Sequence, residues 1–212
     1  MKKEPQLAAL IAVATLTLAG CASSPDSASS LATDAEQTQT ITQIDAVRKA
    51  ITEAEGQIKQ ATEEELSWFA SNDMDAANKA LAEAKKYYAE FEMDPTQANK
   101  STGFFSSQTN ISATEDAIVQ FNTHLTSARD IKATALDILT DAFDYRTQLT
   151  LIDAQEYFPS TVEELNKTLK KLVDQVADGK TDSALAAQPA LVAQQRTLEV
   201  KTVTAIYLTD AK

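Results

Sequence analysis

The chain has 212 residues, and its 31 acidic and 19 basic residues give a formal net charge of −12. This charge argues against nucleic acid and anionic membrane headgroups as partners, because like charges repel. Only four glycines and five prolines are present, so the composition predicts helices throughout.

The first 20 residues are typical of a secretory signal peptide. Lys2 and Lys3 precede an apolar run that ends at Leu18, and the small residues Ala19 and Gly20 follow it. This run is shorter than the about 20 apolar residues that a membrane-spanning helix needs. The sequence therefore predicts cleavage after residue 20.

The only cysteine, Cys21, directly follows this segment. An exported chain with one thiol cannot form an internal disulfide, so this cysteine needs another role. The stretch Leu18-Ala19-Gly20-Cys21 resembles the lipobox of bacterial lipoproteins, which implies that Cys21 carries acyl chains such as palmitate and begins the mature protein. More than one acyl chain would anchor the protein stably to a membrane. The alternative is an ordinary signal peptide followed by a coincidental free cysteine.

Residues 21–33 are expected to form a flexible tether, because Ser, Ala, Asp and Pro bury too little apolar surface to order a chain. Helical periodicity begins near Asp34, and apolar residues then recur in steps of three and four as far as Phe69. A second such stripe, over residues 74–91, predicts another helix. Residues 99–110 show no period and are expected to form a loop.

The second half of the chain predicts one long helix and two shorter ones. Ser112 and Glu115 have the spacing of a capping box, which predicts a helix start. An apolar line without Gly or Pro then predicts an unbroken helix as far as Pro159. A fourth helix is expected from residue 161 to the stop signal at Gly179. The last helix is expected over residues 181–207, with Pro189 either kinking it or resetting its start.

Two stretches of the chain resemble each other. Residues 68–71 (Trp-Phe-Ala-Ser) match residues 157–160 (Tyr-Phe-Pro-Ser) at an offset of 157 minus 68, or 89, and residues 77–81 match 165–169 at 165 minus 77, or 88. Each stretch lies where a predicted long helix meets a short one. The pattern favours two duplicated helical units, 34–110 and 111–212. The alternative is that helix corners share residue types by chance.

The fold expected from these elements is all-α, an elongated antiparallel bundle of about five helices with stripes like those of coiled coils. Residues 157–159 (Tyr-Phe-Pro) and 179–184 (Gly-Lys-Thr-Asp-Ser-Ala) resemble a family of uncharacterised helical lipoproteins of Gram-negative bacteria. The resemblance covers about residues 115–200 and brings no known catalytic residue. In that family the residue after the acylated cysteine directs sorting, so Ala22 implies the outer membrane.

The search for chemical motifs predicts no catalytic, cofactor-binding or metal-binding residues. His124 is the only histidine, so the sequence indicates neither a catalytic triad nor a two-histidine zinc site. Residues 63–65 (Glu-Glu-Glu), Asp73 and Asp75 could attract cations, but a solvated helix face is the favoured interpretation. No cofactor is expected.

The aromatic residues at the two corners are expected to pack between helices, whereas Phe104 and Phe105 lie in a polar loop. Two adjacent rings in a polar loop cannot both face one helix groove, and exposed apolar groups tend to mark partners or membranes. The alternative is that the pair packs beneath the end of the bundle. The sequence therefore predicts a partner-docking site at Phe104 and Phe105.

The function expected from the sequence is a non-enzymatic interaction or scaffold protein of the cell envelope. It would be anchored through Cys21 to the outer membrane, face the periplasm and contact an envelope protein, because long striped helices offer contact surface and reach rather than a polar pocket. The second hypothesis is a periplasmic small-ligand or cation-binding module. An envelope hydrolase comes last, because no nucleophile has a visible base.

Overall fold

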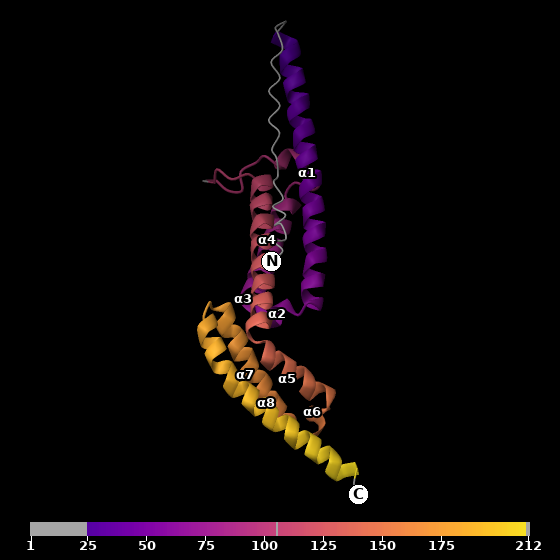
Figure 1. Cartoon of the computed structure of the whole chain (residues 1–212). Helices are drawn as coiled ribbons and strands as arrows, with labels where there is room; N and C mark the ends of the chain where they lie inside the picture. Colours follow the sequence, from indigo (N-terminus) through magenta and orange to yellow (C-terminus); the bar gives the residue numbers. More distant parts are fainter. Residues whose placement is uncertain (1–24, 105, 211–212) are drawn as a thin grey trace, which may run out of the picture. The chain divides into compact units, whose positions relative to one another are not determined.

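The computed structural model describes residues 25–104 and 106–210. These residues form eight α-helices and one 3₁₀ helix, with no β-strand among them (Figure 1). The prediction of an all-α fold is confirmed. The chain divides into a compact unit of residues 1–39 and another of residues 40–212. The predicted signal peptide and Cys21 lie outside the described residues.

Helix α1 (Pro25–Glu63) begins earlier than the sequence predicted. The expectation of a flexible tether is wrong for residues 25–33, which are helical. Proline suits the first turn of a helix, and no glycine follows it before residue 56. Alanine and leucine in this stretch have good helix propensity, so the helix extends towards the N-terminus. Residues 21–24 of the predicted tether lie outside the described residues.

A sharp corner occurs twice in the second compact unit. After α1, Glu65 adopts a left-handed conformation (φ 55°), followed by the four-residue helix α2 (Leu66–Phe69) and the 19-residue helix α3 (Ser71–Ala89). After α5 (Thr140–Leu151), Asp153 adopts the same conformation (φ 53°). It is followed by the four-residue α6 (Ala154–Tyr157) and the 19-residue α7 (Pro159–Ala177). The two corners are separated by 153 minus 65, or 88 residues.

The hydrogen bonds of the two corners repeat at this same offset. The amide of Glu65 donates to the Thr62 carbonyl at 3.0 Å, and that of Asp153 donates to the Thr150 carbonyl at 3.1 Å. The hydroxyls of Thr62 and Thr150 each donate to the carbonyl four residues earlier, at 3.0 Å in both cases. The two corners therefore share one backbone conformation and one hydrogen-bond register. The duplication of the two units stays a prediction.

This register corrects the offset of 89 proposed for the aromatic residues. At 88, Tyr157 corresponds to Phe69 rather than to Trp68. Phe69 is buried and packs 5.8 Å from the Phe143 ring, with Trp68 6.1 Å from the same ring. Tyr157 remains 37% exposed, so it does not hold helices together as Phe69 does.

Helix α4 (Asn110–Ile138) starts before the predicted capping box. Thr109 is the N-cap residue, and its side chain accepts a hydrogen bond from the Ser112 amide at 3.2 Å. The Ser112 hydroxyl accepts in return from the Thr109 amide at 3.1 Å. Serine can serve at the third helical position of such a box as well as at the cap, so the predicted start at Ser112 was one turn late.

The predicted long helix is interrupted at Leu139, where α4 ends and α5 begins. The Thr140 hydroxyl donates to the carbonyls of Leu136 (2.8 Å) and Asp137 (2.6 Å). The Gln188 side chain, from helix α8 (Thr181–Asp210), donates to the Ile138 carbonyl at 2.8 Å. These side chains supply hydrogen bonds at the interruption, which reduces the cost of bending the helix.

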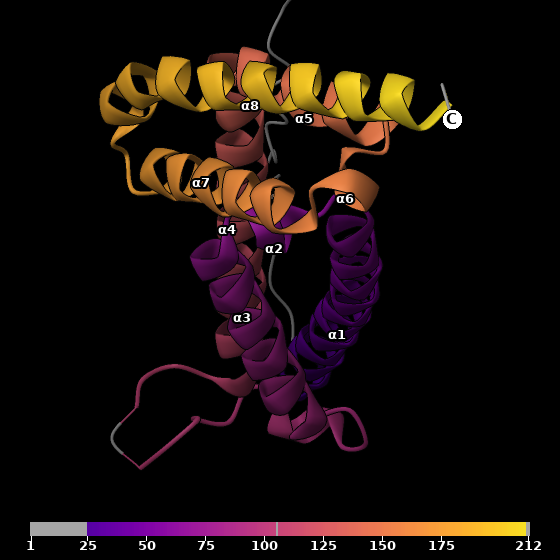
Figure 2. The same cartoon turned by 90° about the horizontal axis from the view of Figure 1, so that it is seen from below.

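Buried side chains form two clusters within residues 40–212. The first joins α1, α3 and most of α4, and the second joins the end of α4 with α5, α7 and α8. Helix α4 contributes to both, and the predicted boundary at residues 110 and 111 falls at the start of this shared helix. Helix α8 continues through Pro189. Figure 2 shows α7 and α8 side by side, with α6 near one end of α7.

The left-handed residues give a first prediction. A left-handed conformation costs a residue with a side chain about 1–2 kcal/mol, and the greater unfolded-state entropy of glycine offsets part of this. The exposed Glu65→Gly variant should therefore gain about 0.5–1 kcal/mol in urea unfolding. Asp153→Gly should gain less, because aspartate tolerates this conformation better.

The matched control is Glu53→Gly, at an exposed position inside α1. Glycine within a helix should cost about 1 kcal/mol there. Equal losses for Glu65→Gly and Glu53→Gly would contradict the left-handed corner.

Candidate functional site

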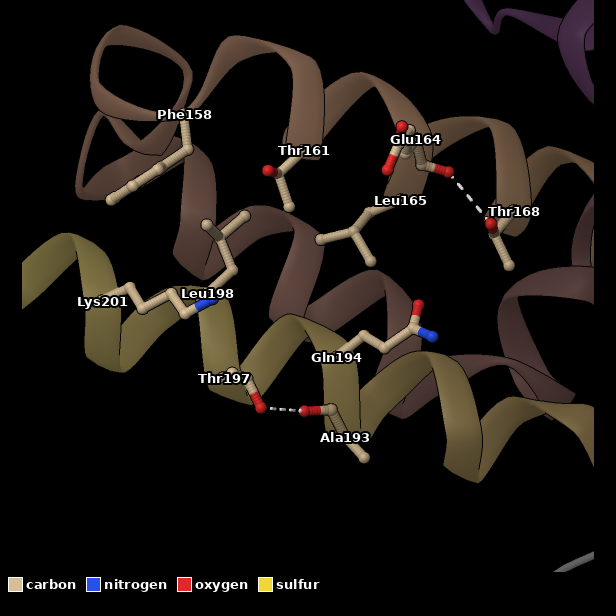
Figure 3. A pocket seen from close by; sticks show the side chains of 10 residues that line it. All are labelled: Phe158, Thr161, Glu164, Leu165, Thr168, Ala193, Gln194, Thr197, Leu198 and Lys201. Atoms are coloured by element: carbon tan, nitrogen blue, oxygen red, sulfur yellow. Dashed lines mark hydrogen bonds between the residues drawn. The ribbon is translucent and has the colours of Figure 1, made fainter.

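An open groove of about 490 Å³ lies between α7 and α8 (Figure 3). Phe158, Leu165 and Leu198 contribute apolar surface to it, and Glu164 and Lys201 contribute charged side chains. The remaining lining side chains are those of Thr161, Thr168, Ala193, Gln194 and Thr197. The groove thus combines an apolar strip with polar margins, as a contact surface for a helix or an extended chain does.

The repeated register explains why this groove forms in the second helix pair. The α7 residues Leu165, Thr168 and Leu172 correspond to the alanines at positions 77, 80 and 84 of α3, which are all buried. Alanine lets two helices approach closely, whereas larger side chains hold them apart. The same framework is therefore closely packed at α3 and α4 and grooved at α7 and α8.

The loop before α4 is fastened at its base. Ser101 and Thr109 form an isolated antiparallel bridge, and the Thr102 amide donates to the Gln108 carbonyl at 2.9 Å. The Ser101 hydroxyl donates to the carbonyls of Gly103 (2.6 Å) and Ser106 (2.5 Å). In Figures 1 and 2 this loop projects away from α3 and α4. It is therefore a hairpin-like projection with an ordered base.

Phe104 lies near the tip of this projection and is 96% exposed. It does not pack beneath the bundle, so the alternative core role does not hold for Phe104. Phe105 lies outside the described residues. The core in this region is formed instead by Phe91, Ala98 and Ile111, which are all buried. The predicted docking function of the loop stays a prediction.

A short 3₁₀ helix, η1 (Pro95–Gln97), directly precedes the loop in the chain. The Asp94 carboxylate accepts hydrogen bonds from the Gln97 side chain (2.7 Å), the Thr96 hydroxyl (2.7 Å) and the Thr96 amide (3.1 Å). The Gln97 and Thr96 bonds hold the pKa of Asp94 below its usual range. Asn99 donates to the Thr40 hydroxyl at 3.2 Å, which ties this segment to α1.

Two of the acidic residues that could have attracted cations, Glu64 and Asp73, contact basic side chains of α4. Glu64 accepts from the Arg129 side chain at 3.2 Å, and this hydrogen bond holds the pKa of Glu64 below its usual range. Its carbonyl accepts from Lys132 at 2.5 Å. Oδ1 of Asp73 lies 3.3 Å from Nδ1 of the half-buried His124, and this contact joins α3 to α4. The described residues contain no group of three or more His, Cys, Asp or Glu side chains that could hold a metal ion.

A smaller pocket at the second corner contains two residues that the sequence analysis missed. Arg146 from α5 and Gln195 from α8 both line it. Each fits an ordinary helical stripe, so neither attracts notice in the sequence. The repeat alignment could have singled out Arg146, because it corresponds to Ile58, which packs against the first core cluster.

No protein-family model matches the chain, and no curated protein or solved structure is significantly similar to it. Among the described ranges, no helix has an apolar stretch long enough to cross a membrane.

The hydrogen bonds of Asp94 before the loop give a second prediction. Asp94→Ala should speed amide exchange at residues 96–98 and 101–109 several-fold at neutral pH, because it removes three hydrogen bonds. The pKa of Asp94 is lower in the folded chain than in the unfolded chain. Its stabilising effect is therefore complete above the ordinary carboxyl range of about pH 4 and is lost as the pH falls through the folded-state pKa.

The control is Asp94→Asn, which keeps an acceptor for the Thr96 amide and should have a smaller effect. The difference in amide exchange rate between wild type and Asp94→Ala should shrink as the pH falls through this acidic range. A difference that stayed constant would contradict the role of the carboxylate.

Proposed function

We propose that this protein is a non-enzymatic interaction protein of the bacterial cell envelope. It is a lipoprotein held in the outer membrane through acyl chains on Cys21, with its helical part facing the periplasm. The support for the anchor is the lipobox-like stretch Leu18-Ala19-Gly20-Cys21, and the support for the outer membrane is Ala22. Stable anchoring needs more than one acyl chain, and lipoprotein processing supplies several on one cysteine.

The observation that carries the interaction role is the exposure of Phe104. A phenylalanine that is 96% exposed contributes little to folding. Its loop is nevertheless fastened by a bridge and by serine and threonine hydrogen bonds. An ordered base reduces the entropy lost when the loop meets a partner, and buried aromatic residues dominate binding energy at many interfaces. Phe104, with Phe105, is therefore the proposed docking point for an envelope protein.

The groove between α7 and α8 offers this protein a second contact surface. Its apolar strip of Phe158, Leu165 and Leu198 suits an apolar helix face or an extended chain. It belongs to the other helix pair, so two partners, or two parts of one partner, could be held together by the same chain. This arrangement suits a scaffold.

Cys21→Ala tests the anchor in cells. The variant should leave the membrane fraction and should take up no labelled palmitate, because the acylated thiol is lost. The wild-type protein should be membrane-bound and labelled. A variant that stays in the membrane fraction, beside a wild-type protein that takes up no palmitate, would refute the lipoprotein assignment.

The double variant Phe104→Ala with Phe105→Ala tests the docking loop. We expect its thermal midpoint to stay within a few degrees of wild type, because a side chain as exposed as Phe104 contributes little to folding. Binding of the envelope partner should weaken by about 2 kcal/mol or more for each ring that it buries. Both quantities can be measured by thermal unfolding and by co-purification after crosslinking in cells.

Two controls frame this result. Leu151→Ala removes another apolar side chain that is 78% exposed and should affect neither quantity. Phe91→Ala removes a fully buried ring and should cost about 3–5 kcal/mol of stability. A loss of stability in the double variant close to that of Phe91→Ala would place the rings in the core and end the docking proposal.

A further inference from the structure

The groove between α7 and α8 is suited to an aromatic side chain. Figure 3 shows Leu165 and Leu198 pointing towards each other between the two helices, with the half-buried Phe158 at one end. The volume of about 490 Å³ is within the range of sites that hold small molecules, so the groove has room for a phenyl ring and the backbone beside it. Aromatic rings pair favourably, so Phe158 adds to the apolar contact that an entering ring would make.

The margins of this groove are polar and carry no net charge. Their two charged side chains are one acid and one base, Glu164 and Lys201. Hydroxyl and amide groups, which both donate and accept hydrogen bonds, are supplied by Thr161, Thr168, Gln194 and Thr197. An uncharged polar segment that carries an aromatic ring therefore matches the groove best.

The projecting loop of this same protein has that chemistry. Residues 101–109 read Ser-Thr-Gly-Phe-Phe-Ser-Ser-Gln-Thr and contain no charged residue. Phe104 is 96% exposed, and the bridge between Ser101 and Thr109 fastens the base of the loop. The loop thus presents an aromatic ring on a polar, uncharged segment whose ends are already ordered.

The loop does not reach the groove of its own chain. It directly precedes α4, whereas the groove belongs to the second core, which contains Ala135 near the other end of α4. The 29 residues of α4 span about 43 Å at 1.5 Å per residue. Figure 1 shows the loop and the α7 and α8 pair near opposite ends of this helix. An occupant with the chemistry of the loop must therefore come from another molecule.

Charge favours a second copy of the chain at this one contact. The net charge of −12 makes two copies repel each other over most of their surfaces. The loop has no charge and the lining of the groove has no net charge, so a contact between them avoids much of this repulsion. Anchoring through Cys21, as proposed above, would also concentrate the copies on one membrane, where a weak contact suffices.

We propose that the loop at residues 101–109 of one copy docks in the α7 and α8 groove of a second copy, with an aromatic ring of the loop against Phe158, Leu165 and Leu198. This inference rests on the proposed docking role of the loop and names its partner. The two surfaces differ, so the contact is heterologous, and each copy still offers its own groove to the loop of a third. The protein therefore assembles head to tail.

The test uses the full chain, purified in mild detergent, and two variants that each lack one surface. The loop variant is Phe104→Ala with Phe105→Ala. The groove variant is Thr197→Arg, which places a long charged side chain at an exposed position of the groove lining. In sedimentation velocity, each variant alone should self-associate at least about tenfold more weakly than wild type. An equal mixture of the two should form a dimer, because one variant supplies the groove and the other supplies the loop.

The matched control is Thr204→Arg. Thr197 and Thr204 are both exposed and lie one heptad apart on α8, and their hydroxyls donate to the carbonyls four residues earlier at 2.9 and 2.8 Å. Thr204 does not line the groove. Thr204→Arg should therefore change self-association less than about twofold. A photocrosslinking group at position 104 should attach to residues 158–168 or 193–201 of the second copy.

Three results would overturn the proposal. These are no self-association of the wild-type chain at about 0.1 mM, equal weakening by Thr197→Arg and Thr204→Arg, or a mixture of the loop and groove variants that stays monomeric. Each leaves the loop as the docking point for a different envelope protein. A loop variant that keeps every crosslinked partner in cells would instead refute the docking role itself, so the two failures are distinguishable.

Discussion

The structure depends on one backbone constraint, the left-handed residue that ends a long helix at each corner. Glu65 and Asp153 have φ values of 55° and 53°, a conformation that residues with side chains rarely adopt. It stops the preceding helix, begins a four-residue helix and sends the chain back along the helix it has just left. Phe69 lies in the four-residue helix after the first corner, and the helices that follow the two corners, α3 and α7, each contribute to one of the two cores.

Side chains then make two different surfaces on one repeated framework. Ala77 and Ala80 of α3 correspond to Leu165 and Thr168 of α7, and the latter two line a groove. Ile58 becomes Arg146, and a core position becomes the wall of a polar pocket. A core residue exchanged for a cation lowers the stability that a fold can reach. Substitutions at such positions are therefore the most informative tests of function.

The sequence predicted the helical class and most of the helices, because apolar stripes with a period near 3.6 are a local signal. It could not predict the interruption at Leu139, because one hydrogen bond there comes from a distant part of the chain. The side chain of Gln188 donates to the carbonyl of Ile138, 50 residues earlier. It placed the start of α4 at Ser112 rather than after Thr109, since both residues fit a capping box. The sequence predicted a docking role for Phe104 because the apolar stripes of the predicted helices already supply enough residues for a core. Arg146 and Gln195 were missed because a pocket depends on how helices meet in space, and four helices, α5 to α8, line this one.

The central functional claim is that the projecting loop at residues 101–109 meets a partner in the cell envelope. The most direct measurement places a photocrosslinking amino acid at position 104 in intact cells, with the same group at the exposed position 151 as the control. A contact confined to the loop predicts one dominant crosslinked envelope protein from position 104 and none from position 151. Failure to crosslink from position 104, or the same products from both positions, would contradict the claim.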